Sequence, residues 1–175
     1  AKRNIYNFLI QEKQNLENGD ELFILSLEKE HSADILHPNL PFTIRIAGKV
    51  DRIELRNNTI RIIDYKTGKV EANKLKIATF EGLTLDLAND KIIQLLCYAL
   101  MFQKSDLKGN YNVEVGIFSF KNMKSGFLPF AFGKGRGVVP ETIITPEFLN
   151  NFTEELVILI QEILNPKISF KEVIK

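Results

Sequence analysis

The sequence predicts one α/β (or α+β) domain, in which helices flank a mixed central β-sheet. Two observations lead to this class. Apolar residues recur at helical spacing at both ends of the chain and once in its middle, whereas short segments rich in β-branched residues lie between these stretches. The resulting order of helix, strands, helix, strand and helix is typical of a sheet that is covered by helices.

The composition is that of an ordinary globular domain. The 175 residues suffice for one domain with a proper core, and the 45% hydrophobic and 26% charged residues lie near the globular average. A disordered, collagenous or repeat-dominated chain is thereby excluded. The 23 basic and 22 acidic residues give a net charge of +1, which excludes a generally cationic nucleic-acid coat but not a local basic patch.

The cellular location is inferred from features that the sequence lacks. No run approaches the roughly 18 apolar residues of a membrane span, and the first residues do not form a signal peptide. The single Cys97 excludes a disulfide framework and a zinc or iron–sulfur site held by cysteines. We therefore expect a cytoplasmic protein with no membrane partner. Because the chain opens with Ala1 directly in helix-like sequence, we also expect residues 1–175 to be a single domain excised from a larger protein.

The first part of the chain predicts a helix followed by a β-meander. Residues 1–18 carry apolar side chains at helical spacing, and Gly19 is a suitable stop. Residues 21–36 are expected to be extended up to a proline-containing turn. Two further strands, over residues 42–55 and 60–65, alternate apolar positions on either side of an asparagine-containing turn.

The middle of the chain predicts a long connection and a buried helix. Residues 67–88 are expected to form a loop with a little helix. Asn89-Asp90 is expected to cap a helix over residues 91–104, which is apolar on most sides and therefore well buried.

The last part predicts a central strand and a closing helix. The strand at residues 112–121 is apolar on both faces, and residues 127–132 are expected to return as its hairpin partner. Thr145 and Pro146 open the last helix, because threonine is a good cap and proline fits the first turn. This helix is expected to end near Asn165.

The most informative segment is the strand pair within residues 47–68. Asp51 lies at the start of one strand and Asp64 at the end of the next, with Lys66 two residues farther on. Residues i and i+2 of a strand point to the same side, so Asp64 and Lys66 would project together while Tyr65 turns away. A hairpin would place Asp51 nearly opposite Asp64. The sequence thus predicts two carboxylates and one ammonium group in one pocket.

This group of side chains suits a hard divalent cation. Mg²⁺ or Mn²⁺ takes one or two carboxylates together with phosphate oxygens of a substrate, and the carbonyl oxygen of Tyr65 could add a further ligand. The ion would polarise a phosphoryl group and lower the pKa of a bound water, with Lys66 beside the developing negative charge. The alternative is an ordinary surface hairpin with solvated charges. Asp64 argues against that alternative, because it follows Ile62 and Ile63, where the strand should enter the core.

Three sequence motifs contain Asp51, Asp64 and Lys66 together with two further polar residues of the middle helix. They are G-K-V-D-R-I around Asp51, I-I-D-Y-K-T-G around Asp64, and a later Q-L-L-C-Y-A-L with Gln94 and Tyr98, which would share one face of a helix. In this order and spacing, the motifs resemble the RecB-like branch of the PD-(D/E)XK nuclease superfamily over roughly residues 25–120. The resemblance implies a restriction-endonuclease-like core.

The resemblance also implies roles for individual residues. The residues that match the catalytic motifs are Asp51, Asp64, Lys66, Gln94 and Tyr98. Asp51 and Asp64 would be metal ligands, and Lys66 would be the catalytic lysine. Gln94 and Tyr98 would position the substrate strand or the lysine.

The chain departs from the family pattern outside these motifs. RecB-like relatives usually carry a histidine in a G-x-x-x-H pattern on a helix ahead of the strands, whereas the first helix here has none. His31 and His37 come later and are expected at the surface. AddB-type relatives hold an iron–sulfur cluster with one early and three late cysteines, whereas Cys97 is expected to pack in a core. Glu28 matches a glutamate of many relatives, and its role is left open. A truncated domain would explain why the histidine and the cluster cysteines are missing. A catalytically inactive copy of the nuclease domain would explain it equally.

The implied function is that of a Mg²⁺- or Mn²⁺-dependent deoxyribonuclease. We expect an exonuclease domain of a helicase–nuclease in double-strand-break repair and recombination, with DNA and a helicase domain or partner subunit as its partners. The motifs leave open whether cutting is at ends or internal. The alternative is a catalytically inactive nuclease-like module that binds DNA or acts as a scaffold. A third interpretation is a small domain whose charges are incidental.

Cations interleaved with aromatic residues predict a DNA-binding surface near the end of the chain. No acidic residue occurs between Val115 and Pro140, and phenylalanines alternate there with basic side chains, as in channels for single strands. The alternative is that the phenylalanines belong to the core and that the glycine-rich stretch is a hairpin tip. The candidate DNA contacts are Lys121, Lys124, Lys134 and Arg136.

Overall fold

The computed structural model describes residues 2–103, 110–133 and 139–170. The helices are α1 (Lys2–Glu17), α2 (Asp90–Gln103) and α3 (Pro146–Leu164). The strands are β1 (Leu22–Ile35), β2 (Ile44–Arg56), β3 (Thr59–Lys66), β4 (Lys76–Ile77), β5 (Asn112–Ser119), β6 (Phe127–Pro129) and β7 (Ala131–Phe132). Short 3-10 helices are η1 (Ala72–Leu75), η2 (Leu83–Leu85), η3 (Leu87–Asn89) and η5 (Met123–Ser125).

Five strands form the central sheet, in the order β1-β2-β3-β5-β6. The first three are an antiparallel meander, β5 lies parallel to β3, and β6 returns antiparallel to β5. A parallel pair needs a crossover connection, which the segment containing α2 provides. The sheet is therefore mixed, and the fold class predicted from the sequence, a central sheet flanked by helices, is confirmed.

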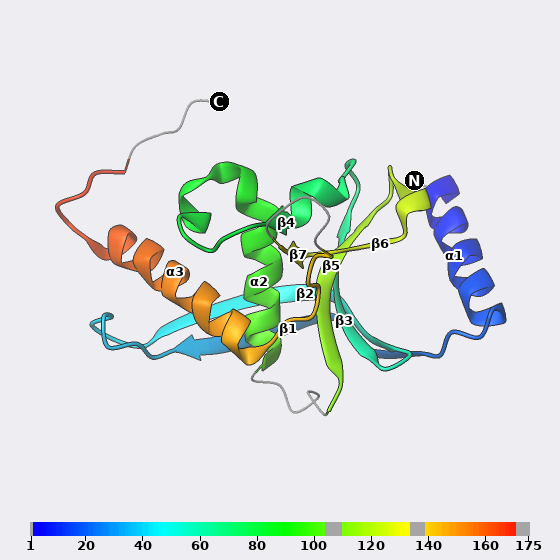
Figure 1. Cartoon of the computed structure of the whole chain (residues 1–175), viewed down its shortest axis with the longest axis horizontal. Coiled ribbons are helices and arrows are strands. Elements are labelled where there is room, and N and C mark those ends of the chain that lie inside the picture. Colours follow the sequence, from blue (N-terminus) through cyan, green and yellow to red (C-terminus); the bar gives the residue numbers. More distant parts are fainter. Residues whose placement is uncertain (1, 104–109, 134–138, 171–175) are drawn as a thin grey trace.

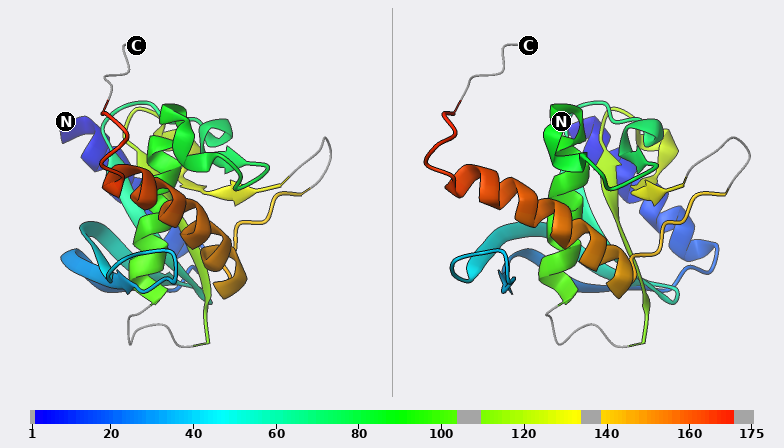
Figure 2. Two further views of the ribbon diagram at one scale, coloured as in Figure 1. Left: turned by 90° about the vertical axis from the view of Figure 1, so that its left-hand side faces the viewer. Right: turned by 60° about the vertical axis from the view of Figure 1, so that its left-hand side comes forward.

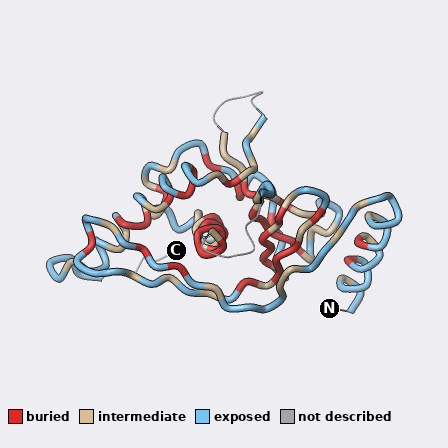
Figure 3. Tube along the Cα trace, turned by 90° about the horizontal axis from the view of Figure 1, so that it is seen from below, coloured by how far each residue is buried: buried red, intermediate tan, exposed pale blue. Residues whose placement is uncertain are grey.

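The helices cover the two faces of the sheet unequally. Figure 1 shows α1 on one side of the sheet and α2 and α3 on the other, and Figure 2 shows α3 beside α2. The main core lies between the sheet and α2, whereas most of α1 is exposed (Figure 3). From α1, Phe8 packs on Ile63 and Phe118 in a smaller cluster. Among the described residues, none of the helices combines the length and the apolar character that a membrane crossing requires.

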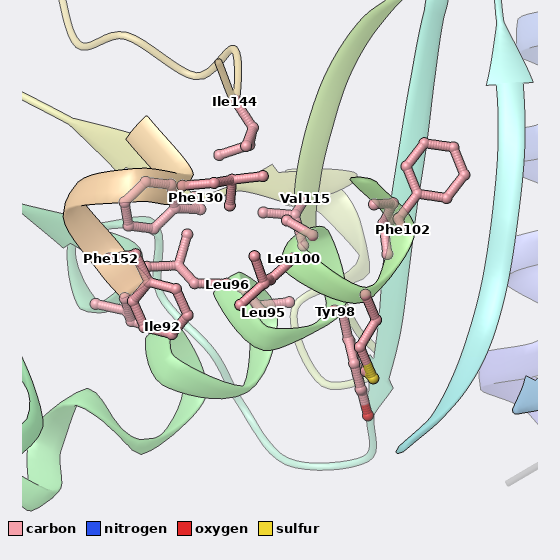
Figure 4. Close-up of a cluster of buried hydrophobic side chains, with 14 of the residues drawn as sticks. Ile92, Leu95, Leu96, Tyr98, Leu100, Phe102, Val115, Phe130, Ile144 and Phe152 are labelled. Carbon is pink, nitrogen blue, oxygen red and sulfur yellow. The ribbon is translucent and has the colours of Figure 1, made fainter. Parts of the chain in front are cut away.

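Helix α2 is apolar on most sides because it is packed on most sides. Figure 4 shows its side chains Ile92 and Leu96 near Phe130 and Phe152, which come from the end of the sheet and from α3. Cys97 packs partly buried against the same core, and burial raises the pKa of its thiol to about 11. This thiol therefore behaves as a packing group.

The two long helices begin in different ways. As predicted, Thr145 caps α3, with its hydroxyl oxygen accepting a hydrogen bond from the N–H of Phe148. Before α2, the capping residue is Asp86, whose carboxylate accepts a hydrogen bond from the N–H of Ala88 and starts η3. Because η3 runs directly into α2, the predicted cap at Asn89-Asp90 lies inside a continuous helical stretch.

The segment predicted as a single hairpin partner forms two separate strands. Only β6 pairs with β5, at a place where a Cβ on Gly116 would collide with the carbonyl oxygen of Leu128. Glycine thus allows the two strands to approach each other closely. β7 pairs instead with β4 in a separate two-stranded parallel sheet.

Candidate active site

Strands β2 and β3 place the two predicted carboxylates opposite each other. They pair antiparallel with Arg52 across from Ile63, so the next position along the ladder sets Asp51 across from Asp64. Oδ2 of Asp51 also accepts a hydrogen bond of 2.8 Å from the N–H of Tyr65. This bond ties the end of β3 to β2 and orients the Asp51 carboxylate.

Asp64 is the more buried carboxylate, with 3% of its surface exposed. Burial raises the pKa of its carboxyl group, and the nearby Lys66 opposes this rise only in part. Nζ of Lys66 lies 2.9 Å from Oδ2 of Asp64, and the lysine side chain is 28% exposed. The pair therefore lies at the boundary between the core and solvent.

Helix α2 holds Lys66 from a second side. Nζ of Lys66 donates a hydrogen bond of 2.8 Å to Oε1 of Gln94, and Nε2 of Gln94 donates one of 2.9 Å to the hydroxyl of Tyr98. Tyr98 is buried at the margin of the main core, and Figure 4 shows its hydroxyl pointing away from the apolar cluster. Polar contacts thus run without interruption from Asp64 to Tyr98.

Tyr65 turns its side chain to the opposite face of the sheet. Its ring stacks on Phe118 and Phe120 with centroid distances of 6.1 and 5.6 Å, and it meets Phe8 of α1 edge-on. Its hydroxyl accepts a hydrogen bond of 3.2 Å from Arg52. Only the backbone carbonyl of Tyr65 is therefore a candidate metal ligand.

Glu28 lies on β1, where the register sets it across from Asp51. Its φ of 50° is the left-handed conformation, which is uncommon outside glycine. Its exposed carboxylate forms an ion pair with Lys49 on β2. The structure thus brings Glu28 to the rim of the site and matches its charge with a lysine.

The donor set fits a hard divalent cation. Mg²⁺ keeps several waters and needs only one or two protein carboxylates, which Asp51 and Asp64 can supply. A cation would also stabilise the charge on Asp64, which burial disfavours. No group of three or more His, Cys, Asp or Glu side chains is arranged for a metal ion in the described part of the chain. Water and substrate oxygens would therefore have to complete the coordination.

The predicted DNA contacts lie apart from this group or outside the described residues. Lys124 belongs to η5, which packs against α1 on the other face of the sheet, and Lys121 is exposed in the turn before it. Lys134 and Arg136 fall outside the described residues. The interleaved phenylalanines pack in or against the two cores, and they are Phe118, Phe120, Phe127, Phe130 and Phe132.

Two residues of the site were missed by the sequence analysis. Lys91 lies one helical turn before Gln94, and its positive charge, after the larger effect of Lys66, opposes the rise in the pKa of Asp64 that burial causes. A Cβ on Gly48 of β2 would lie 3.3 Å from Cε of Met101 and 3.5 Å from Cε1 of Tyr98, so glycine lets β2 approach α2 closely. The spacing of three residues between Lys91 and Gln94 could have revealed that they share a helix face. No local signal in the sequence marks Gly48.

Comparison with known proteins covers nearly the whole chain. A family model described as the PD-(D/E)XK nuclease superfamily matches residues 6–173, a range that includes every element of the site. A search of the curated proteins finds no match.

Proposed function

The chain belongs to the PD-(D/E)XK nuclease superfamily, and from this premise we propose that it is a Mg²⁺- or Mn²⁺-dependent deoxyribonuclease of the RecB-like type. The carrying observation is the chain of contacts from Asp64 through Lys66 and Gln94 to Tyr98. A surface hairpin with solvated charges would not place a buried carboxylate beside a lysine that a neighbouring helix also holds.

The carboxylates would hold the metal ion. Asp51 and Asp64 would be its ligands, and the carbonyl oxygen of Tyr65 could be a further one. A bound ion supplies Lewis-acid activation of the phosphodiester and of a water molecule. The N–H of Tyr65 keeps Asp51 in one orientation for this purpose. The negative charge of Asp64 is buried and only partly compensated by Lys66, so a metal ion near it would stabilise the charged form of this carboxylate.

Lys66 would stabilise the negative charge that develops during hydrolysis. Water attacks phosphorus in line and gives up a proton to solvent, while the P–O bond to the leaving oxygen breaks. Negative charge grows on the phosphoryl and leaving oxygens, and the leaving oxygen then takes a proton from solvent to become a hydroxyl. The ammonium group of Lys66 is fixed between Asp64 and Gln94, so it needs little reorganisation to meet this charge. Gln94 and Tyr98 act through Lys66 and are positioning residues.

We also propose a wider setting for the activity. The resemblance of the three motifs to RecB-like nucleases supports a nuclease within a helicase–nuclease of double-strand-break repair and recombination, with DNA and a helicase domain or partner subunit as partners. The proposed DNA contacts are Lys121 and Lys124 on the α1 side, together with Lys134 and Arg136, which fall outside the described residues.

A cleavage assay on end-labelled single-stranded DNA with Mg²⁺ or Mn²⁺ tests the central proposal. Lys66→Ala should abolish cleavage, whereas Lys13→Ala, an exposed lysine of α1 paired with Glu17, should leave it unchanged. Cleavage that survives in the Lys66→Ala protein would place the chemistry elsewhere.

A catalytically inactive DNA-binding or scaffolding module is the second candidate. It is favoured by one observation, that α1 contains no histidine. Titration with Mn²⁺ separates the two candidates. A nuclease must bind Mn²⁺, and Asp51→Asn and Asp64→Asn should weaken this binding. An inactive module does not require Mn²⁺ binding at all.

A further inference from the structure

Helix α1 docks on the sheet mainly through polar side chains and leaves its aliphatic ones in solvent. Besides Phe8, the residues of α1 that are not exposed are Asn4, Gln11, Glu12 and Asn15. The exposed apolar residues of the helix are Ile5, Tyr6, Leu9, Ile10 and Leu16. A surface helix normally buries its apolar stripe against the core. The reversed arrangement in α1 indicates that its apolar surface is covered by a partner.

Three of the exposed apolar residues form one row along the helix. Leu9 precedes Glu12 by three positions and Leu16 follows it by four, so the three side chains share one face. Ile5 extends this row by one more turn. Glu12 binds two arginines of β2, which places the row on the flank of α1 that faces β2.

The edge strand β1 adds two apolar side chains beside this row. In the register of β1 and β2, Leu27 lies across from Arg52, and cross-strand partners point to the same face of a sheet. Ile24 lies across from Glu54, with which Arg52 pairs. Because Arg52 also binds Glu12 of α1, both side chains of β1 lie on the face that carries α1. They are 53% and 57% exposed, so they continue the apolar surface of the helix.

The charged residues of α1 are placed against the dipole of the helix. The first turn contains Lys2 and Arg3 and no acidic residue, whereas the last turn contains Glu17 and no basic residue. Glu21 follows the helix, and Lys13 offsets Glu17 through an exposed ion pair of 3.5 Å. Cations at the start of a helix and anions at its end are unfavourable. An antiparallel neighbour with the same order of charges offsets this disadvantage, and a second copy of α1 has this order.

We propose that two copies of the domain form a dimer in which the α1 helices pack antiparallel through Ile5, Leu9 and Leu16. In this two-fold arrangement, Ile5 of one copy faces Leu16 of the partner subunit, and Leu9 lies near the axis. Lys2 and Arg3 then face the acidic end of the partner helix, and the two apolar side chains of β1 extend the contact. The candidate active site lies on the α2 side of the sheet, so this contact does not cover it (Figure 1).

Sedimentation measurements over a series of concentrations test the dimer. The parent chain should show a monomer–dimer equilibrium. Leu9→Glu/Leu16→Glu should weaken the dimer at least about 100-fold, because two apolar side chains of each copy lose their burial. The matched control Ile158→Glu/Ile163→Glu, which changes two similarly exposed residues of α3, should dimerise as the parent does. A parent chain that is monomeric at every concentration overturns the proposal, and so does a dimer that Leu9→Glu/Leu16→Glu leaves intact.

Charge reversal tests the antiparallel order. Lys2→Glu/Arg3→Glu should weaken the dimer about tenfold at low salt, because acidic ends then face each other. Glu17→Lys/Glu21→Lys should weaken it to a similar extent. A protein that carries all four substitutions should dimerise as the parent does, since opposite charges again face each other. If the fourfold variant dimerises no better than the two double variants, the antiparallel arrangement is wrong.

Discussion

The two faces of β2 and β3 bury charge in opposite ways. On the α1 side, two arginines and two glutamates pair with one another in a closed network of buried groups, which are Glu12, Arg52, Glu54 and Arg56. On the α2 side, buried Asp64 forms an ion pair with Lys66, which is partly exposed. The two sets lie on opposite faces of the same hairpin.

The difference separates charges that stabilise the fold from charges that are free to react. The α1-side network pairs each of its charges with an opposite charge and is further anchored by Asp20 and by the hydroxyl of Tyr65. On the α2 side, the charge of Asp64 is compensated incompletely, and its partner Lys66 is partly exposed to solvent. Perturbed carboxyl groups at such places are typical of active sites.

Breaking the α1-side network should give the largest effect. Arg56→Met leaves Glu12 and Glu54 buried with less compensation, and removal of one partner of a buried pair costs about 3–5 kcal/mol of stability. Chemical denaturation measures the loss. Arg45→Met, which removes an exposed pair with Asp34, should cost less than about 1 kcal/mol. Equal losses in the two variants would mean that the buried network is not a stabilising unit.

The matched substitution on the α2 side should affect activity more than stability. Lys66→Met removes a positioned cation, and the rate of DNA cleavage should fall about 100- to 1000-fold. The free energy of unfolding should fall by only about 1–2 kcal/mol, because Lys66 is partly exposed and water can approach Asp64 in its place. A stability loss as large as that of Arg56→Met would show that the α2-side pair is also structural.

The sequence predicts the α2-side group well because its geometry is local. Strand alternation orients Asp64 and Lys66, a hairpin turn brings Asp51 across, and the spacing of four residues aligns Gln94 with Tyr98. Each of these relations spans a few residues or one turn. The contact between Gln94 and Lys66, 28 positions apart, was expected only from the resemblance to the nuclease family, and the structure brings all five residues together.

The α1-side network could not be predicted, because its pairs are distant in sequence. Glu12 and Arg52 are separated by 40 positions, and Glu12 resembles the other polar residues of an exposed helix. Its burial depends on how α1 docks on the sheet. For the same reason, the sequence did not indicate that Gly48 contacts α2, nor that residues 127–132 divide between two sheets.

A smaller effect tests how α2 supports Lys66. Tyr98→Phe removes the acceptor for Nε2 of Gln94 and keeps the aromatic packing. Loss of this hydrogen bond corresponds to about 1 kcal/mol, or about fivefold in the cleavage rate, without a change in substrate affinity. The matched control is Tyr111→Phe, an exposed tyrosine before β5, which should cleave at the parent rate. A Tyr98→Phe protein with the parent rate would show that the Lys66–Gln94 contact is sufficient alone.

The pH dependence of stability distinguishes the two sides by its sign. The folded-state pKa of Asp64 is raised by burial, so its contribution to stability is fully present below the ordinary carboxyl pKa of 3.8 and is lost as the pH rises through the folded value. Hydrogen bonds from Asn57 and Arg56 lower the pKa of Asp20, so its contribution to stability is present above pH 3.8 and is lost as the pH falls through the folded value.

Denaturation in EDTA from about pH 3 to about pH 7 compares Asp64→Asn and Asp20→Asn with the parent protein. Relative to the parent, Asp64→Asn should become more stable as the pH rises, and Asp20→Asn should become less stable. Slopes of the same sign would contradict the distinction, because they would mean that both carboxylates are stabilised by the fold. Opposite slopes would show that Asp64 is held at a cost in stability, which a site that binds a metal ion can offset.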